Sequence, residues 1–153
     1  MVPSLNAIHE FMAQENIAII SDNSNTGSYS FALRDRLITG GYNVRHIRPW
    51  LNDFDDNGRC LCVEKLPPVF SALILDLMPA AATIIIDEAI TKGINHIWLL
   101  PRAYNDILRE KGIFNNLNLI YNNNILNYLH IPKSIQRSYR DFVKFAFSAF
   151  DRR

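Results

Sequence analysis

Cysteine is scarce in this sequence of 153 residues, in which only Cys60 and Cys62 occur. Two residues apart on an extended segment, their side chains point to the same face, and such a pair seldom forms a disulfide. A single Cys-x-Cys pair with no second pair and no nearby histidine is also a poor metal site. We therefore interpret both as small, semi-buried apolar residues in a reducing compartment.

Long apolar runs and an excess of charge of one sign are absent as well. No stretch approaches the roughly 20 apolar residues of a membrane span, and no basic start with an apolar stretch marks a signal peptide. The formal net charge is +1, so the overall charge does not favour nucleic acid. We expect a cytoplasmic protein with no specific nucleic-acid partner and no membrane span.

The motifs of several enzyme classes are also missing. A glycine-rich dinucleotide fingerprint is absent, which argues against NAD and FAD. The four histidines have neither the spacing of a metal pair nor a nearby nucleophile motif. Asp76 ends an apolar run, whereas Asp87 and Glu88 lie on an expected helix, so they are not a convincing acid pair. We expect no metal and no catalytic residue, and we favour a binding protein over an enzyme.

The clearest pattern that is present lies in residues 17–49. An apolar run is followed by the polar loop SDNSNTG, a helical pattern over 28–39, the pair Gly40-Gly41 and an alternating run over 42–47. This order is typical of a β-loop-α-β unit, with the polar loop placed where such folds hold phosphates.

The same alternation of helix, glycine and apolar strand recurs along the chain. Strands that alternate with helices at this spacing predict a parallel sheet with right-handed crossovers. We expect a doubly wound, five-stranded α/β domain over 1–132, with strand order 3-2-1-4-5. The expected strands are 17–20, 42–47, 72–77, 95–100 and 117–121, and the expected helices are 5–14 (capped by Ser4), 28–39, 79–92 (ended by Gly93), 103–111 (ended by Gly112) and 125–129.

An amphipathic helix is expected at the C-terminus, within residues 133–153. Its aromatic stripe either docks on its own sheet, forms a homodimer or partner interface, or lies on a membrane surface. The stripe contains Ile135, Tyr139, Phe142, Ala146 and Phe150, and the basic residues opposite are Lys133, Arg137, Arg140 and Lys144.

The candidate site follows from the fold, because ligands of open parallel sheets bind beyond the C-terminal ends of the strands. The first loop leads into a helix start, whose free N–H groups attract phosphate. Alternatively, its polar residues only form turns and a helix cap. Arg48 and Arg102 are expected at neighbouring strand ends, where they either hold a phosphate or stay solvated. The candidate residues are Ser21, Asp22, Asn23, Ser24, Asn25, Thr26, Gly27, Ser28, Tyr29, Arg48, Pro49, Met78, Arg102, Asn122 and Asn124.

Three segments carry a resemblance to a known family: residues 17–49, DLMPAAATIIIDEAITKGINHIWLLP, and Gly112–Leu129. Over about residues 5–130 the chain resembles the stand-alone CoA-binding domain family, which is related to the nucleotide-binding part of succinyl-CoA synthetase α-subunits. The resemblance implies a Rossmann-like fold and non-catalytic binding of CoA or a related adenine nucleotide at the C-terminal strand ends.

The sequence departs from that family at the ligand-facing edge. Ser21 stands where the family has a glycine-containing turn, Leu100-Pro101-Arg102 stands where it tends to carry Gln-x-Gly, and Asn124 lies near a frequent cysteine position. Without the glycine, phosphate binding must rely on side chains and the helix start. A second hypothesis therefore stays open: a protein-interaction module that has lost the ligand and acts through its C-terminal helix.

Overall fold

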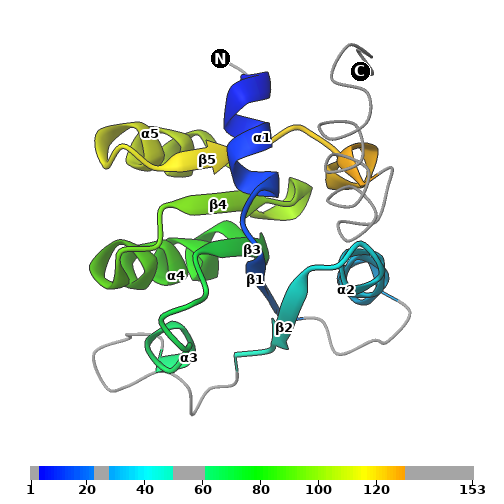
Figure 1. Ribbon diagram of the computed structural model, residues 1–153. Helices are drawn as coiled ribbons and strands as arrows, with labels where there is room; N and C mark the ends of the chain where they lie inside the picture. The colour runs from blue at the N-terminus through cyan, green and yellow to red at the C-terminus, as the bar shows by residue number, and fades with distance from the viewer. Residues whose placement is uncertain (1–3, 23–27, 50–60, 130–153) are drawn as a thin grey trace.

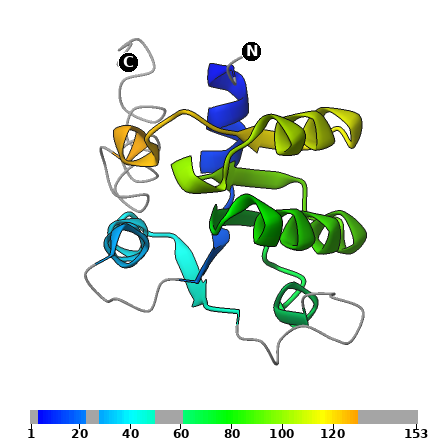
Figure 2. The ribbon, with the colours of Figure 1, turned by 180° about the vertical axis from the view of Figure 1, so that it is seen from behind.

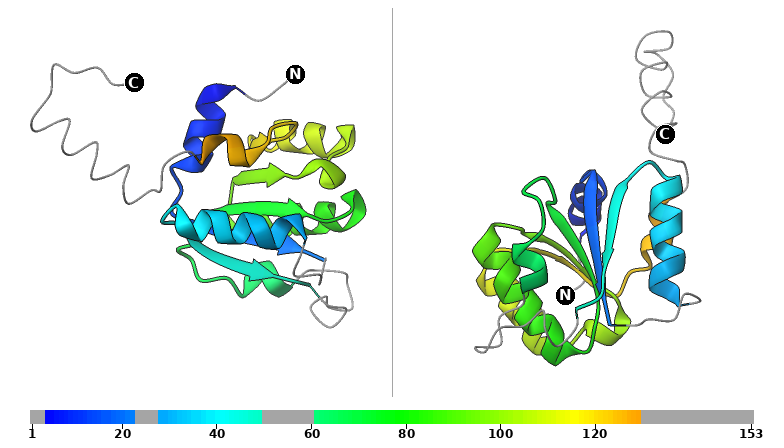
Figure 3. Two further views of the ribbon diagram at one scale, coloured as in Figure 1. Left: turned by 90° about the vertical axis from the view of Figure 1, so that its right-hand side faces the viewer. Right: turned by 90° about the horizontal axis from the view of Figure 1, so that it is seen from below.

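The computed structural model describes residues 4–22, 28–49 and 61–129, and in it five parallel strands form one sheet between two layers of helices (Figure 1). All arrowheads point to the same side of the molecule (Figure 3). The doubly wound α/β fold expected from the sequence is thus confirmed. The strands are β1 (Asn16–Ser21), β2 (Asn43–Ile47), β3 (Ala72–Asp76), β4 (His96–Leu99) and β5 (Asn118–Ile120).

The helices divide between the two faces of the sheet (Figure 2). One face is covered by α1 (Leu5–Met12), α2 (Tyr29–Thr39) and the 3-10 turn η3 (Ile125–Tyr128). The other face is covered by α3 (Leu61–Glu64), α4 (Pro79–Lys92) and α5 (Asp106–Phe114). A further 3-10 turn, η2 (Pro101–Ala103), joins β4 to α5.

The strand order is β2-β1-β3-β4-β5, so the expected order 3-2-1-4-5 is wrong. The burial of the strands gives the physical reason. All five residues of β3 are buried, as an interior strand requires, whereas every residue of β2 retains some exposure. The run ALIL of β3 is continuously apolar, and β2 alternates with polar residues, so β2 suits the edge and β3 the centre.

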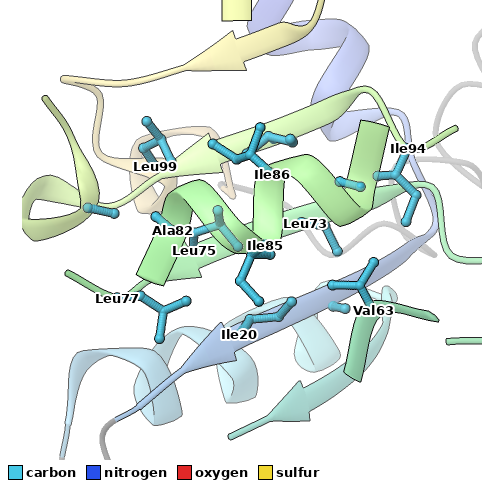
Figure 4. Close-up of a cluster of buried hydrophobic side chains, with 14 of the residues drawn as sticks. Ile20, Val63, Leu73, Leu75, Leu77, Ala82, Ile85, Ile86, Ile94 and Leu99 are labelled. Atoms are coloured by element: carbon cyan, nitrogen blue, oxygen red, sulfur yellow. The ribbon is translucent and has the colours of Figure 1, made fainter. Parts of the chain in front are cut away.

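Alternate side chains of the central strands build two separate cores. Ile20 and Leu75 point toward α3–α5 and pack with Ile85 of α4 (Figure 4). Their neighbours Ile19 and Ile74 point to the opposite face, toward α1 and α2. On that second face Phe11 and Trp98 meet edge to face with ring centroids 5.2 Å apart. Each core therefore depends on the two-residue period of the strands.

Several predicted helix ends are confirmed. The Ser4 side chain accepts a hydrogen bond from the amide of Ala7 and caps α1. Pro79 lies in the first turn of α4, where its missing N–H is not needed. Gly41 and Gly93 have φ of 94° and 87°, the left-handed conformation that follows a helix.

Both predicted ends of the helix expected over 103–111, which corresponds to α5, are wrong. The chain makes the turn η2 first, and α5 then begins at Asp106 because the side chain of Asn105 caps it. At the other end α5 passes through Gly112, and Asn116 takes the left-handed conformation with φ of 55°. Gly112 serves packing instead, since a Cβ there would lie 2.8 Å from Cδ2 of Leu119.

Two predictions concern residues that the structure does not describe. The C-terminal helix within 133–153 and Cys60 lie outside the described residues. Cys62 is buried in α3, as expected for a small apolar residue. Within residues 4–22, 28–49 and 61–129, no helix combines the length and apolar character that crossing a membrane requires.

Candidate functional site

The strand order creates a break in the winding between β1 and β3. The chain leaves β1 toward α2 on one face of the sheet and leaves β3 toward α4 on the other face. Open α/β sheets bind ligands beyond the strand ends at such a reversal. A cavity of about 570 Å³ lies at this edge, lined by Tyr29, Asp76, Leu100, Pro101, Arg102, Asn122, Asn123 and Asn124.

Arg102 bridges this break in the winding. Its Nε lies 2.7 Å from Oδ1 of Asp76, and its Nη2 lies 2.6 Å from the carbonyl oxygen of Asp76. The same Nη2 also donates to the carboxylate of Asp22, which follows β1. Burial acts to lower the pKa of Arg102, but the hydrogen bonds to Asp76 and Asp22 outweigh burial and raise it. The guanidinium thus already has two carboxylate partners.

A second contact joins two residues of the cavity lining that come from distant parts of the sequence. The hydroxyl of Tyr29, the first residue of α2, donates to Oδ1 of Asn124 at 3.0 Å. Oδ1 of Asn124 also accepts from the amide of Leu126 and caps η3. Burial, and secondarily the charge of Asp76, raises the pKa of the Tyr29 hydroxyl. Tyr29 therefore stays a neutral hydrogen-bonding group at neutral pH.

The asparagine loop after β5 is held by its own hydrogen bonds. Asn122 has the left-handed φ of 56°, a conformation that asparagine tolerates better than most residues. The Asn123 side chain donates to the carbonyl of Tyr121 at 2.9 Å, and its backbone carbonyl accepts from Nε1 of Trp98 at 3.2 Å. The loop is therefore anchored to the buried Trp98 and presents amide groups to the cavity in a fixed arrangement.

Two helices begin at this edge without a capping side chain. Neither Ser28 at the start of α2 nor Met78 at the start of α4 caps its helix, whereas Asn105 caps α5. The Ser28 hydroxyl instead lies 3.1 Å from that of Ser30. The first N–H groups of α2 and α4 thus have no bond from the N-cap side chain, which suits an anion at either start.

The structure brings together only part of the predicted site. Four predicted residues line the cavity: Tyr29, Arg102, Asn122 and Asn124. Ser21 is buried at the end of β1, Ser28 and Met78 occupy the two helix starts, and Pro49 follows β2 with Arg48. The predicted residues Asn23, Ser24, Asn25, Thr26 and Gly27 lie outside the described residues.

The expected proximity of Arg48 and Arg102 is wrong. Arg48 follows β2 and Arg102 follows β4, and the strands β1 and β3 lie between them. The prediction failed because it placed β2 inside the sheet, whereas β2 is an edge strand. The two arginines therefore do not flank one strand end together.

Sequence reasoning missed four residues that line the cavity. Asp76 carried a usable signal, because a single carboxylate ends the otherwise apolar run ALIL at the ligand-facing edge of the sheet. Asn123 stands between two predicted residues, and its role became visible only through its contact with Trp98. Leu100 and Pro101 carried no polar signal. Within the part of the chain that the structure describes, no three His, Cys, Asp or Glu side chains form a group able to hold a metal.

Comparison with known proteins bears on the fold and on the family of this chain. The structure resembles a hypothetical protein from Pyrococcus horikoshii OT3 with a TM-score of 0.67 and 19% identity, over 83% of this chain and 93% of that chain. It also resembles a conserved hypothetical protein from Pyrococcus furiosus with a TM-score of 0.60 and 16% identity, over 74% of this chain and 98% of that chain. No curated protein matches the sequence. Residues 15–129 match the pattern of the CoA binding domain, and the chain therefore belongs to the CoA-binding domain family.

Proposed function

We propose that this protein binds CoA or a related adenine nucleotide without catalysing a reaction on it. The observation that carries the proposal is the cavity of about 570 Å³ at the break in the winding, inside the segment that matches the family. Small-molecule sites commonly have volumes of about 300–1,000 Å³ and sit at this position of α/β sheets.

The lining suggests which part of the ligand each group contacts. The start of α2, whose first residue is Tyr29, has no capping side chain and offers backbone N–H groups to the phosphates. Leu100 and Pro101 form an apolar surface that suits the flat face of a base. The amide of Asn122 can both donate and accept, whereas Asn124 offers only its Nδ2 as a donor, because its Oδ1 already accepts from Tyr29 and Leu126. Both groups suit the polar edge of a base or a ribose.

The positions at which the sequence departs from the family pattern suggest that the phosphates are held differently in this protein. Because β1 ends at Ser21 and the next glycine in the sequence is Gly27, the backbone has no glycine directly after the strand to approach a pyrophosphate closely. Arg102 stands where the resemblance implies a Gln-x-Gly segment, and it is already paired with carboxylates. We therefore assign the first phosphate contacts to the start of α2, since Arg102 can bind a phosphate only after the contact with Asp22 has opened.

A calorimetric titration with CoA, dephospho-CoA, ATP and NAD tests the proposal. We expect saturable binding of CoA or ATP, and an accompanying rise of the melting temperature with ligand concentration. Ser28→Glu places a negative charge at the start of α2, where it competes with the phosphates, so affinity should fall at least about tenfold. Thr39→Glu adds the same charge at the other end of α2 and serves as the matched control.

Two results would contradict the proposal. The first is the absence of binding by all four nucleotides to a sample that unfolds cooperatively. The second is turnover of the bound nucleotide, which would make the protein an enzyme. The first result would favour the protein-interaction module, and binding partners of the segment 133–153 would then be sought.

A further inference from the structure

We propose that Asp22 sets the affinity of the cavity for anions by occupying Arg102 until a phosphate-bearing ligand displaces it. This inference rests on the proposed function, because it concerns the same edge of the sheet. In this proposal Asp22 does not contact the ligand. Its carboxylate competes with the ligand phosphate for Arg102.

The two carboxylates that hold Arg102 differ in their surroundings. The Asp76 side chain is only 11% exposed, and Asp76 holds the guanidinium through both its carboxylate and its backbone carbonyl. The Asp22 side chain is 43% exposed and contacts the guanidinium through Nη2. Asp76 is thus the fixed anchor of Arg102, whereas Asp22 is the partner that solvent and solutes can reach.

Exposure makes the outer contact exchangeable. Ion pairs at the surface are weak, because water solvates both partners well when they separate. A phosphate offers Arg102 the same chemistry as a carboxylate, with charged oxygens that accept from the guanidinium. A ligand phosphate can therefore replace Asp22 at Nη2 while the bonds to Asp76 stay in place.

The charges around Arg102 explain why a phosphate must displace Asp22 before it can bind the guanidinium. Arg102 is a single cation between Asp22 and Asp76, so the three side chains together carry an excess of negative charge at neutral pH. A phosphate that arrives beside them is repelled by Asp22 as well as attracted by Arg102. Neutralising Asp22 should therefore have two effects: it removes the repulsion of the phosphate, and it weakens the contact between residue 22 and Arg102 that competes with the phosphate.

The test compares Asp22→Asn with the wild type in calorimetric titrations of CoA and of inorganic pyrophosphate at one fixed, low ionic strength. We expect Asp22→Asn to bind at least one of these anions about three- to tenfold more tightly. The matched control is Asp35→Asn, which removes an exposed carboxylate of α2 from its own contact with Arg34 at 3.0 Å. A thermal melt of each variant verifies that the fold is retained.

The outcomes separate this inference from the proposed function. If CoA binds to the wild type but Asp22→Asn binds both anions equally or less tightly, the competitor role is overturned and nucleotide binding stands. If Asp22→Asn gains affinity for pyrophosphate while none of the four nucleotides (CoA, dephospho-CoA, ATP and NAD) binds to either protein, the competitor role stands and the proposed function falls. If neither protein binds either anion, or if Asp35→Asn gives the same gain, the competitor role is overturned.

Discussion

The hydroxyl of Tyr29 donates a hydrogen bond of 3.0 Å to Oδ1 of Asn124, and both residues line the candidate cavity. The two residues come from opposite parts of the domain, the start of α2 and the loop after β5. This bond sets the relative position of a helix start and of the asparagine loop. It should therefore affect ligand binding more than folding.

Tyr29→Phe tests that relationship. The variant loses the bond to Asn124 but keeps the ring, and a hydrogen bond of this kind contributes about 0.5–1.5 kcal/mol. We expect nucleotide affinity to fall about two- to tenfold, with only a small change in melting temperature. The control is Tyr104→Phe, whose hydroxyl bonds to Asp106 and does not line the cavity. Equal affinity losses in both variants would contradict a specific role for Tyr29.

Removing Arg102 should destabilise the fold, because it leaves the buried Asp76 without its charged partner. Arg102→Ala is expected to lower the free energy of unfolding by about 1–3 kcal/mol, as measured by urea denaturation at pH 7. Combining it with Asp76→Asn should restore part of this loss, since the uncompensated charge is gone. Additive losses in the double variant would show that the pairing itself is not the cause.

Gly112→Ala should destabilise the protein, although alanine normally favours a helix over glycine by about 1 kcal/mol. A Cβ at this position would lie 2.8 Å from Cδ2 and 3.2 Å from Cβ of Leu119. Overpacking of this kind costs about 1–3 kcal/mol. Adding Leu119→Ala should relieve part of that loss, which a double-mutant cycle in urea would measure. A higher melting temperature for Gly112→Ala alone would refute the packing role.

Stability should fall as the medium is acidified from pH 7.5 to 5.5. Burial lowers the pKa of His96, and burial together with Arg34 and Arg48 lowers the pKa of His46. Nδ1 of His96 also lies 3.0 Å from the Asn118 amide nitrogen, a donor that suits the neutral ring. Near and below the ordinary histidine pKa of about 6.5, the unfolded chain therefore binds more protons than the folded chain. The stability that these histidines contribute is fully present above that pH, and it is lost as the pH falls from there toward their lower pKa in the folded state.

Urea denaturation at several pH values measures this loss. We expect His96→Gln to flatten the decline, since glutamine can accept from Asn118 without titrating. The control His9→Gln replaces an exposed histidine of α1, and an equal flattening in that variant would show that the effect is not specific to His96. A slope that is unchanged in His96→Gln would exclude His96 as a source of the acid sensitivity.

The sequence predicted the fold well where local chemistry alone decides it. Four apolar runs and the alternating run over 42–47 identified the five strands, and Ser4, Pro79 and Gly93 marked helix ends through capping and backbone conformation. The strand order was missed, because which strand lies at the edge depends on burial across the whole sheet. The alternating polar residues of β2 were the available signal for its edge position.

The candidate site was predicted less completely for a related reason. Tyr29, Arg102, Asn122 and Asn124 were found because the fold places strand ends and helix starts at one edge. Asp76 was set aside as part of an unconvincing acid pair, although it anchors Arg102. Which charges pair across a sheet depends on strand neighbours, and a wrong strand order therefore hides such pairs.

The origin of the two cores has a consequence for synthesis on the ribosome. The core beneath α3, α4 and α5 needs little beyond β1 and the continuous stretch 61–121, whereas the core beneath α1 and α2 also draws on Ile125. The contact between Tyr29 and Asn124 likewise joins the beginning of the domain to its end. A nascent chain therefore cannot complete the lining of the cavity until the asparagine loop after β5 has left the exit tunnel, by which time nearly all residues of both cores have been synthesised.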